Sequence, residues 1–404
     1  MKRLLRIGCS TFVLSFIPIV TWFLLGLTLD ANLTNVFSLT YPIQFIWGLL
    51  LAIFATGANI KAKKENNKNA VLSGITLGIF IGAIIFLLFL IFVDEYITFM
   101  SMEVNVYKNF VIYAILISFI RMVFSFILEK MYFEDREKLA NKHSIIFNIL
   151  NMVVLVVLSL ITKNQVIIIV ITLCIMAIYV LVLLIKNYSY FKLDFNILTN
   201  FKYKSVEIFE YFMLFLTYFF GFSNAFALGA DIVALNFVAL VTDSQWDCFV
   251  AVTTCAEIDI CNKEYNFKKT IKHSFVFALG VMASSIVLFF TLFAFYDVGL
   301  KIGLLLLSVE LAGFLEVPLS YGFEPFVHLE HSATVNTAFG VVKYIIRTFI
   351  SVSIPFAYCT QIGQLVAMCL SLVYLLYIRL HFYKQNKEGV LLRKKRNNLN
   401  RLSD

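Results

Sequence analysis

Long uninterrupted apolar segments constrain this chain more than any other feature of its sequence. Such segments recur from residue 7 to residue 383, and apolar residues do not alternate with polar ones within them. A bilayer offers no water to backbone N–H and C=O groups, so a segment that crosses it must form a helix or join a closed barrel. Segments of about 20 apolar residues without alternation favour helices. We therefore predict an all-α polytopic membrane protein.

Twelve of these segments are predicted to be transmembrane helices. They lie at 7–29, 40–60, 70–93, 109–128, 143–162, 165–185, 206–228, 232–256, 270–296, 300–320, 340–358 and 361–383. Only 14% of the residues are charged, whereas a soluble domain carries about 25%. The chain starts with the basic residues Lys2 and Arg3, and no small-residue cleavage site follows before Asp30. The first segment is therefore predicted to be an uncleaved span.

The distribution of Lys and Arg predicts the orientation. Of the 33 basic residues, 28 lie in segments predicted to face the cytoplasm, and Lys108, Lys163 and Lys301 lie in outside loops. Positive charge retains short loops in the cytoplasm, so we predict a plasma-membrane protein with both termini cytoplasmic. Because the basic residues occupy these short loops, the net charge of +8 does not indicate nucleic-acid binding.

An internal repeat divides the spans into six plus six. Trp47 and Trp246 are 199 residues apart, and at that offset Lys64-Glu65 matches Lys263-Glu264. Chance similarity between two membrane hairpins would also produce such matches. An even number of spans in each half gives a parallel repeat. The predicted organisation is an N-terminal lobe (1–186), a cytoplasmic linker (187–205), a C-terminal lobe (206–383) and a basic cytoplasmic tail (384–404).

Acidic residues within the membrane are costly and mark candidate sites. The first six predicted spans contain no Asp or Glu. The predicted cation-binding residues lie in the second half and are Glu210, Asp243, Asp247 and Glu310. Two close carboxylates in a low dielectric do not both ionise freely unless a cation lies between them. The close pair Asp243 and Asp247 therefore predicts a proton or Na⁺ site. Hydrogen bonding of this pair to neighbouring helices, without ion movement, would also account for it.

Further polar residues complete the candidate site. Asn236 shares a helix face with Asp243 and Asp247, and Glu316 precedes Pro318, where a bent helix would free carbonyl groups to bind a cation. Arg121 is predicted to be a counter-ion of these acids or of an anionic substrate. Three residues are expected at the cytoplasmic interface or in solvent: Glu207, Glu257 and Arg347.

One cluster has the composition of a metal site, namely Glu324, His328 and His331. It lies in a predicted cytoplasmic loop with no further ligand, so we expect an amphipathic loop helix there and predict no metal. The sequence contains no Walker A motif, which argues against a primary pump. Its seven cysteines form no CxxC pair and are interpreted as small apolar packing residues.

The six-plus-six arrangement with a basic linker resembles the multidrug and toxic compound extrusion (MATE) family, within the multidrug/oligosaccharidyl-lipid/polysaccharide flippase superfamily. The resemblance includes the loop TTCAEIDICNKEYNFKKTIKHSFVFALGV after span eight, and the polar starts of spans five and eleven, KHSIIFNILNMVVLV and FGVVKYIIRTFISV. It implies V-shaped lobes that alternate between outward-open and inward-open states. It also implies a C-lobe cation site on spans seven, eight and ten. Other members use an acid in the first span, which this sequence lacks.

We therefore predict a secondary active transporter, not an enzyme, that exports a cationic or amphipathic solute in exchange for H⁺ or Na⁺. No cofactor beyond this coupling ion is expected, and the protein is predicted to be a monomer in contact with membrane lipid. One alternative is a flippase for a lipid-linked saccharide or polysaccharide precursor, for which Arg121 is the available mid-membrane cation. A membrane-embedded lipid transferase using Glu324, His328 and His331 is another, and a non-transporting relative is a further one.

Overall fold

The computed structural model describes residues 1–29, 36–67, 69–100, 102–188, 201–228, 232–293, 298–330, 332–354 and 358–400. These residues form helices and connecting turns, because each apolar segment satisfies its own backbone hydrogen bonds. The helices of the first half are α1 (Lys2–Thr28), α2 (Val36–Leu51), η2 (Ala52–Thr56), α3 (Gly57–Lys64), α4 (Asn69–Ile91), α5 (Val93–Phe99), α6 (Val104–Phe133), α7 (Glu137–Ile161) and α8 (Gln165–Asn187). Those of the second half are α9 (Phe201–Ala227), α10 (Ile232–Cys261), α11 (Phe267–Phe293), α12 (Leu300–Gly313), η4 (Phe314–Glu316), α13 (Val317–Ser320), α14 (Glu324–Glu330), α15 (Ala333–Ser353) and α16 (Cys359–Asn400).

Nine helical stretches within the described residues are long and apolar enough to cross a membrane. The prediction of a multi-pass α-helical membrane protein is therefore confirmed. Helices α1, α9 and α10 have 27, 27 and 30 residues and occupy the places of predicted spans one, seven and eight, but they are not among the nine. The full count of twelve spans stays a prediction.

Two of the spans are interrupted. The second passes from α2 through a π-helical turn, η2, into α3. The tenth bends after Gly313 through the 3₁₀ turn η4, and Pro318 lies in the first turn of α13, as predicted. Helix α13 ends at Ser320, the predicted end of this span, and α14 follows after a turn and runs to Glu330. Phe323 and Val327, which are 2% and 1% exposed, pack with Leu375 of α16 and hold α14 against the bundle.

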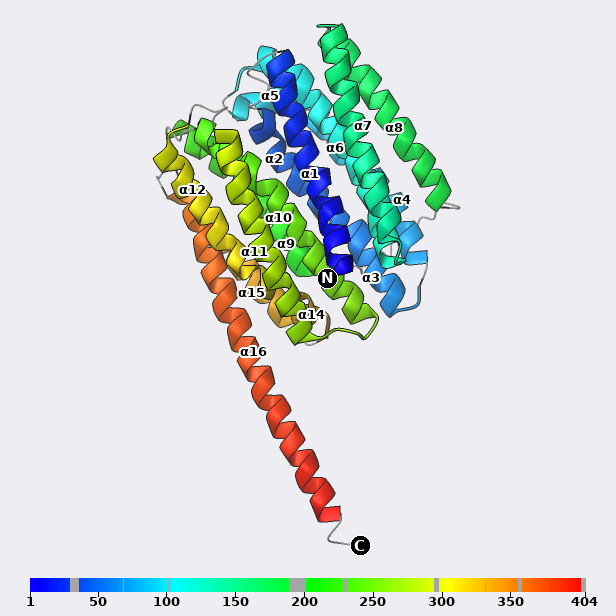
Figure 1. The fold of residues 1–404 in the computed structure, drawn as a ribbon, viewed down its shortest axis with the longest axis vertical. Coiled ribbons are helices and arrows are strands. Elements are labelled where there is room, and N and C mark those ends of the chain that lie inside the picture. The colour runs from blue at the N-terminus through cyan, green and yellow to red at the C-terminus, as the bar shows by residue number, and fades with distance from the viewer. Residues whose placement is uncertain are drawn as a thin grey trace.

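The two halves of the chain meet along two helix pairs. Helix α1 packs against α10, and α2 packs against α9. In Figure 1, α7 and α8 lie along one side of the bundle and α12 and α16 along the other, with α1, α2, α9 and α10 between them. Helix α16 extends well beyond the other helices at its carboxyl end. The residue boundaries of the predicted lobes, linker and tail stay predictions.

Side-chain size decides how closely the helices approach. A Cβ on Gly78 of α4 would lie 2.3 Å from the ring of Phe126 on α6, so the missing side chain permits this contact. The rings of Phe124 on α6 and Phe147 on α7 stack with centroids 4.4 Å apart. Large apolar side chains on the outside of α4 and α11, such as Phe80 and Val287, are more than half exposed. Such a surface suits contact with lipid rather than water.

Candidate functional site

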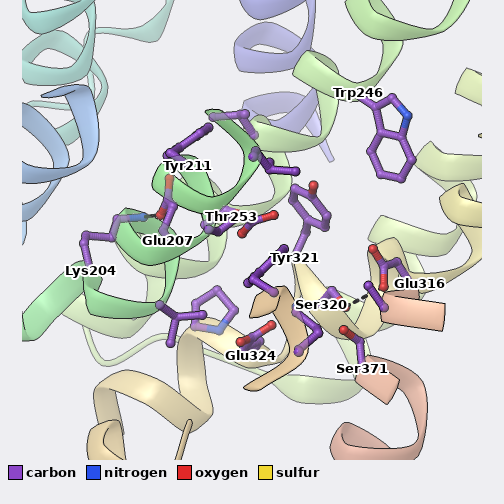
Figure 2. Close-up of a pocket in the computed structure, with 18 of the residues that line it drawn as sticks. Lys204, Glu207, Tyr211, Trp246, Thr253, Glu316, Ser320, Tyr321, Glu324 and Ser371 are labelled. Carbon is purple, nitrogen blue, oxygen red and sulfur yellow. Dashed lines mark hydrogen bonds and ion pairs between the residues drawn. The ribbon is translucent and has the colours of Figure 1, made fainter. Parts of the chain in front are cut away.

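A cavity of about 230 Å³ lies among helices of the second half, with α2 of the first half on one side. Figure 2 shows its lining, with Tyr321 in the middle and Lys204 and Glu207 at one side. Seven carboxylate side chains line it, namely Glu207, Glu210, Asp247, Glu257, Glu310, Glu316 and Glu324. Three basic side chains line it as well, namely Lys204, Lys343 and Arg347. The lining is therefore rich in ionisable groups and predominantly acidic.

The structure brings together most of the predicted cation-binding residues. Glu210 of α9, Asp247 of α10 and Glu310 of α12 all line the cavity, although they come from different helices. Glu316, predicted as a secondary polar residue, lines it too. The side chains of Asn236 and Asp243 on α10 lie outside the described residues. Whether any of these residues binds an ion stays a prediction.

Glu310 is held by donors from two other helices. Its Oε2 accepts a hydrogen bond from Nε1 of Trp246 at 2.7 Å and one from Nε2 of Gln364 at 3.0 Å. The indole of Trp246 packs edge-on against Phe314, and a Cβ on Gly313 would lie 2.8 Å from it. The glycine thus lets α12 approach the indole closely, which fixes the orientation of the Glu310 carboxyl group.

A second group of polar side chains surrounds Glu210 and Glu316. The Tyr344 hydroxyl donates to Glu210, and the charge of Lys343 acts on both Glu210 and Glu316. Lys343 is only 5% exposed, and its ammonium group lies 4.3 Å from the ring centroid of Tyr344. Ser320 Oγ donates to Glu316 Oε2 at 3.4 Å (Figure 2). Basic and acidic groups therefore share the same buried space.

Arg347 lies inside this cavity rather than at the predicted membrane interface. Its guanidinium group donates to the Tyr218 hydroxyl, and its Nε is buried without a hydrogen-bond partner among the described residues. Arg347 follows Lys343 by four residues, so both side chains lie on the face of α15 that borders the cavity. Arg121 lies apart from the cavity, on α6, where it donates to Asn148 Oδ1 at 3.4 Å.

A further buried cluster lies at the end of the bundle predicted to face the cytoplasm, and sequence analysis missed part of it. Lys204 of α9 pairs with Glu207 and with Glu257 of α10. Nearby, Thr56 Oγ1 donates to Glu129 Oε2 of α6 at 3.4 Å. Exposed fractions are 4% for Lys204, 3% for Glu257 and 5% for Glu129. The prediction that Glu257 is solvated was wrong, because α9 covers it.

The first half of the chain thus contains a buried acid, contrary to expectation. Predicted span four ended at residue 128, which placed Glu129 outside the membrane, but α6 continues to Phe133. The sequence Glu129-Lys130 has the composition of a solvated helix end. Tertiary packing, which includes η2 through Thr56, buries Glu129.

Ion pairs also join the two halves at the same end of the bundle. Arg3 of α1 pairs with Glu137 at 2.8 Å and with Asp259 of α10 at 3.3 Å. Lys64 pairs with Glu330 of α14 at 2.7 Å. Glu65, just after α3, accepts from the Tyr203 hydroxyl at 2.5 Å and from Lys202 at 3.0 Å. These two hydrogen bonds hold the pKa of Glu65 below its usual range.

The residues of the metal-like cluster have other partners. Glu324 Oε1 accepts from Asn336 Nδ2 at 3.1 Å, and His328 Nε2 lies 3.0 Å from the carbonyl oxygen of Lys202. His331 lies outside the described residues. Glu324 and His328 belong to α14, in agreement with the expected loop helix.

No family model matches the sequence, and no curated protein is significantly similar to it. Solved structures are similar in fold. MATE in the bent conformation matches with a TM-score of 0.66 at 12% identity, over 96% of both chains. The outward-facing conformation of a multidrug resistance MATE family transporter of the MOP superfamily matches with a TM-score of 0.63 at 15% identity, over 96% of both chains.

Two further structures show the range of this fold. An inward-facing conformation of a multidrug resistance MATE family transporter matches with a TM-score of 0.58 at 14% identity, over 96% of both chains. A MOP superfamily transporter from Pyrococcus furiosus, described as having a binding pocket of reverse polarity, matches with a TM-score of 0.65 at 14% identity, over 94% of this chain and 95% of the other. At such low identity, these matches establish the fold alone.

Proposed function

We propose that this protein is a secondary active transporter that exports a cationic or amphipathic solute in exchange for H⁺ or Na⁺. In this proposal it lies in the plasma membrane with both termini in the cytoplasm, and its two halves rock between outward-open and inward-open arrangements. The fold supports the proposal, since proteins of this fold are described in both outward-facing and inward-facing conformations.

The observation that carries the proposal is the convergence of Glu210, Asp247 and Glu310 on one cavity. Seven carboxylates against three basic groups give this cavity an excess of acidic residues. A cavity whose lining has an excess of one sign of charge concentrates ions of the other sign. A proton, Na⁺ or an organic cation is therefore the occupant that the lining favours.

Coupling would arise from unequal binding to the two arrangements of the halves. Ion and solute each shift the conformational equilibrium only as far as their affinities for the two states differ. Glu310 is bound by donors from α10 and α16, so a change in its charge acts on three helices at once. This arrangement suits a site whose occupancy alters helix packing.

The test is transport of a fluorescent organic cation, ethidium, in proteoliposomes under a separately imposed proton or Na⁺ gradient. We expect gradient-driven transport that falls at least about tenfold in Glu310→Gln and in Asp247→Asn, since coupling energies of 1–3 kcal/mol correspond to factors of 5 to 150. The control is Glu95→Gln, because Glu95 is exposed on α5 and should not affect the rate. Unchanged transport in both cavity variants would refute the assignment.

Lys343 and Arg347 favour a second candidate, because both line the same cavity. A flippase for a lipid-linked saccharide needs cations that can hold phosphate. Translocation of a lipid-linked oligosaccharide that requires Arg347, with no ethidium transport, would establish this candidate in place of the first. Because the lining has more acidic than basic groups, we favour the cation exporter over the flippase.

A further inference from the structure

We propose that Glu129 and Glu257 form a shared proton-binding site between the two halves of the chain, occupied when the cytoplasmic ends of the helices are packed together. Glu257 and Lys204 line the same cavity as Glu210, Asp247 and Glu310, to which the proposed function assigns the coupling ion, whereas Glu129 is not among the described lining residues. Proton binding at the shared site can be measured without any transported solute.

The proposal starts from which helices supply the cluster. Glu129 lies on α6 and Thr56 on η2, both in the first half. Glu257 lies on α10 and Lys204 on α9, both in the second half. The charges of Glu257, Lys204 and Glu207 all act on Glu129. The cluster is thus assembled from both halves and would be divided if they separated.

The number of charges in the cluster is unbalanced. One ammonium group, that of Lys204, faces the carboxyl groups of Glu207, Glu257 and Glu129. Lys204 bonds Glu207 and Glu257, while the partner of Glu129 is the neutral hydroxyl of Thr56. An uncompensated charge away from water costs several kcal/mol or neutralises itself. A proton on one of these carboxyl groups is the simplest neutralisation.

Other ionisable groups nearby do not supply the missing positive charge. Tyr132, on the same helix as Glu129, donates its hydroxyl to Ser10 of α1 and is a neutral phenol at ordinary pH. Lys130, the next residue on α6, bonds the carbonyl oxygen of Asn187 on the other side.

An unpartnered atom points to the position of the proton. Glu257 Oε1 pairs with Lys204, but Glu257 Oε2 is buried with no hydrogen-bond partner among the described residues. A buried acceptor without a donor costs about 1–3 kcal/mol. Protonation turns that oxygen into a hydroxyl, which is then a donor available to a neighbouring carboxylate. One proton would therefore both give this oxygen a hydrogen-bonding role and neutralise the excess negative charge.

The shared site links protonation to the packing of the two halves. When the cytoplasmic ends separate, Glu129 loses the charges of Glu257 and Glu207 and gains water, so its proton is released to the cytoplasm. Because the packed arrangement binds the proton more tightly, acid favours that arrangement. The expected sign is closure of the cytoplasmic side as pH falls.

The test uses the full-length protein in nanodiscs without added solute. Spin labels at Lys138 and Glu264, which are exposed on the cytoplasmic side of the two halves, report the separation at a series of pH values. In the wild type, the distance between the two labels should shorten as the pH falls. Glu129→Gln mimics the protonated form and should remain short at alkaline pH. Glu134→Gln, at the exposed end of the same helix, should behave as the wild type.

Infrared difference spectra supply a second readout that a purely structural role would not affect. The wild type should show a protonated-carboxyl band in the closed state that is lost in the Glu129→Gln, Glu257→Gln double variant. Glu129→Asp, which still titrates, should restore the pH response. A wild-type pH profile in Glu129→Gln, or an unchanged band in the double variant, would overturn the site. A wild-type protein that shows this band but does not transport ethidium would count against the proposed function only.

Discussion

Lys63 Nζ donates a hydrogen bond to Asn262 Oδ1 at 3.4 Å, across 199 positions of sequence. Lys63 is near the end of α3, and Asn262 directly follows α10. The two helix ends that meet here are separated by the same offset as the predicted repeat. The contact joins the two halves at the surface predicted to face the cytoplasm, beside the ion pair of Lys64 and Glu330.

Cross-linking these two positions should arrest transport. A Lys63→Cys, Asn262→Cys protein with the native cysteines replaced should react with a flexible, reducible bifunctional thiol reagent. We expect transport of ethidium to be lost on cross-linking and to return on reduction, since the proposed cycle needs these ends to separate. Each single-cysteine variant treated with the same reagent is the control. Full transport by the cross-linked protein would exclude separation at this point.

Alanine substitutions at Gly78 and Gly280 should have different effects on the stability of the protein. A Cβ at Gly78 would lie 2.3 Å from Phe126 and 2.8 Å from Phe54 Cβ, so Gly78→Ala should destabilise the protein by about 1–3 kcal/mol through overpacking. A Cβ at Gly280 of α11 would meet no described atom within 4 Å beyond its own helix backbone and chain neighbours. Gly280→Ala should be neutral or stabilise by up to about 1 kcal/mol, because alanine favours helix. Thermal unfolding in detergent compares them, and equal midpoints would contradict this packing.

The two repeat-related tryptophans allow the hydrogen bond to Glu310 to be isolated. Trp246→Phe removes the donor to Glu310, at a cost of about 1 kcal/mol in addition to lost packing. Trp47 Nε1 is buried without a partner among the described residues, so Trp47→Phe loses packing only. Trp246→Phe should therefore unfold at the lower temperature and lose more transport. If Trp47→Phe proved the more harmful, the hydrogen bond would have no measurable role.

The length of the apolar segments made most of the fold predictable. The hydrocarbon thickness fixes how many residues a span needs, and Pro318 indicated the bend in the tenth span. The helix α14 that follows was expected as a loop helix, but its packing was not, because Phe323 and Val327 are buried by α16 rather than by lipid. A polar segment packed between helices has the composition of a loop.

The candidate site was predictable in part for the same reason. Composition places Glu210, Asp247 and Glu310 in the membrane, where only function or pairing retains an acid. It does not give the rotation of a helix about its axis, so the inward direction of Arg347 was not foreseen. Burial of Glu129 depends on tertiary packing around the end of α6, including Thr56 of η2, which no local pattern records.

The surface contact of Glu65 should depend on pH in a defined direction. Hydrogen bonds from Tyr203 and Lys202 stabilise the charged carboxylate and hold its pKa below the usual range. The contact is therefore complete above the ordinary Glu pKa and is lost only as pH falls through the lowered value. Tyr203→Phe removes the larger of these effects, so Glu65 should then titrate at a less acidic pH. Carbon-13 NMR of carboxyl-labelled glutamate, assigned with Glu65→Gln, measures this. Tyr265→Phe is the control, because Tyr265 donates to the Gly322 carbonyl instead, and an equal shift in both variants would show that the Tyr203 hydrogen bond is not the cause.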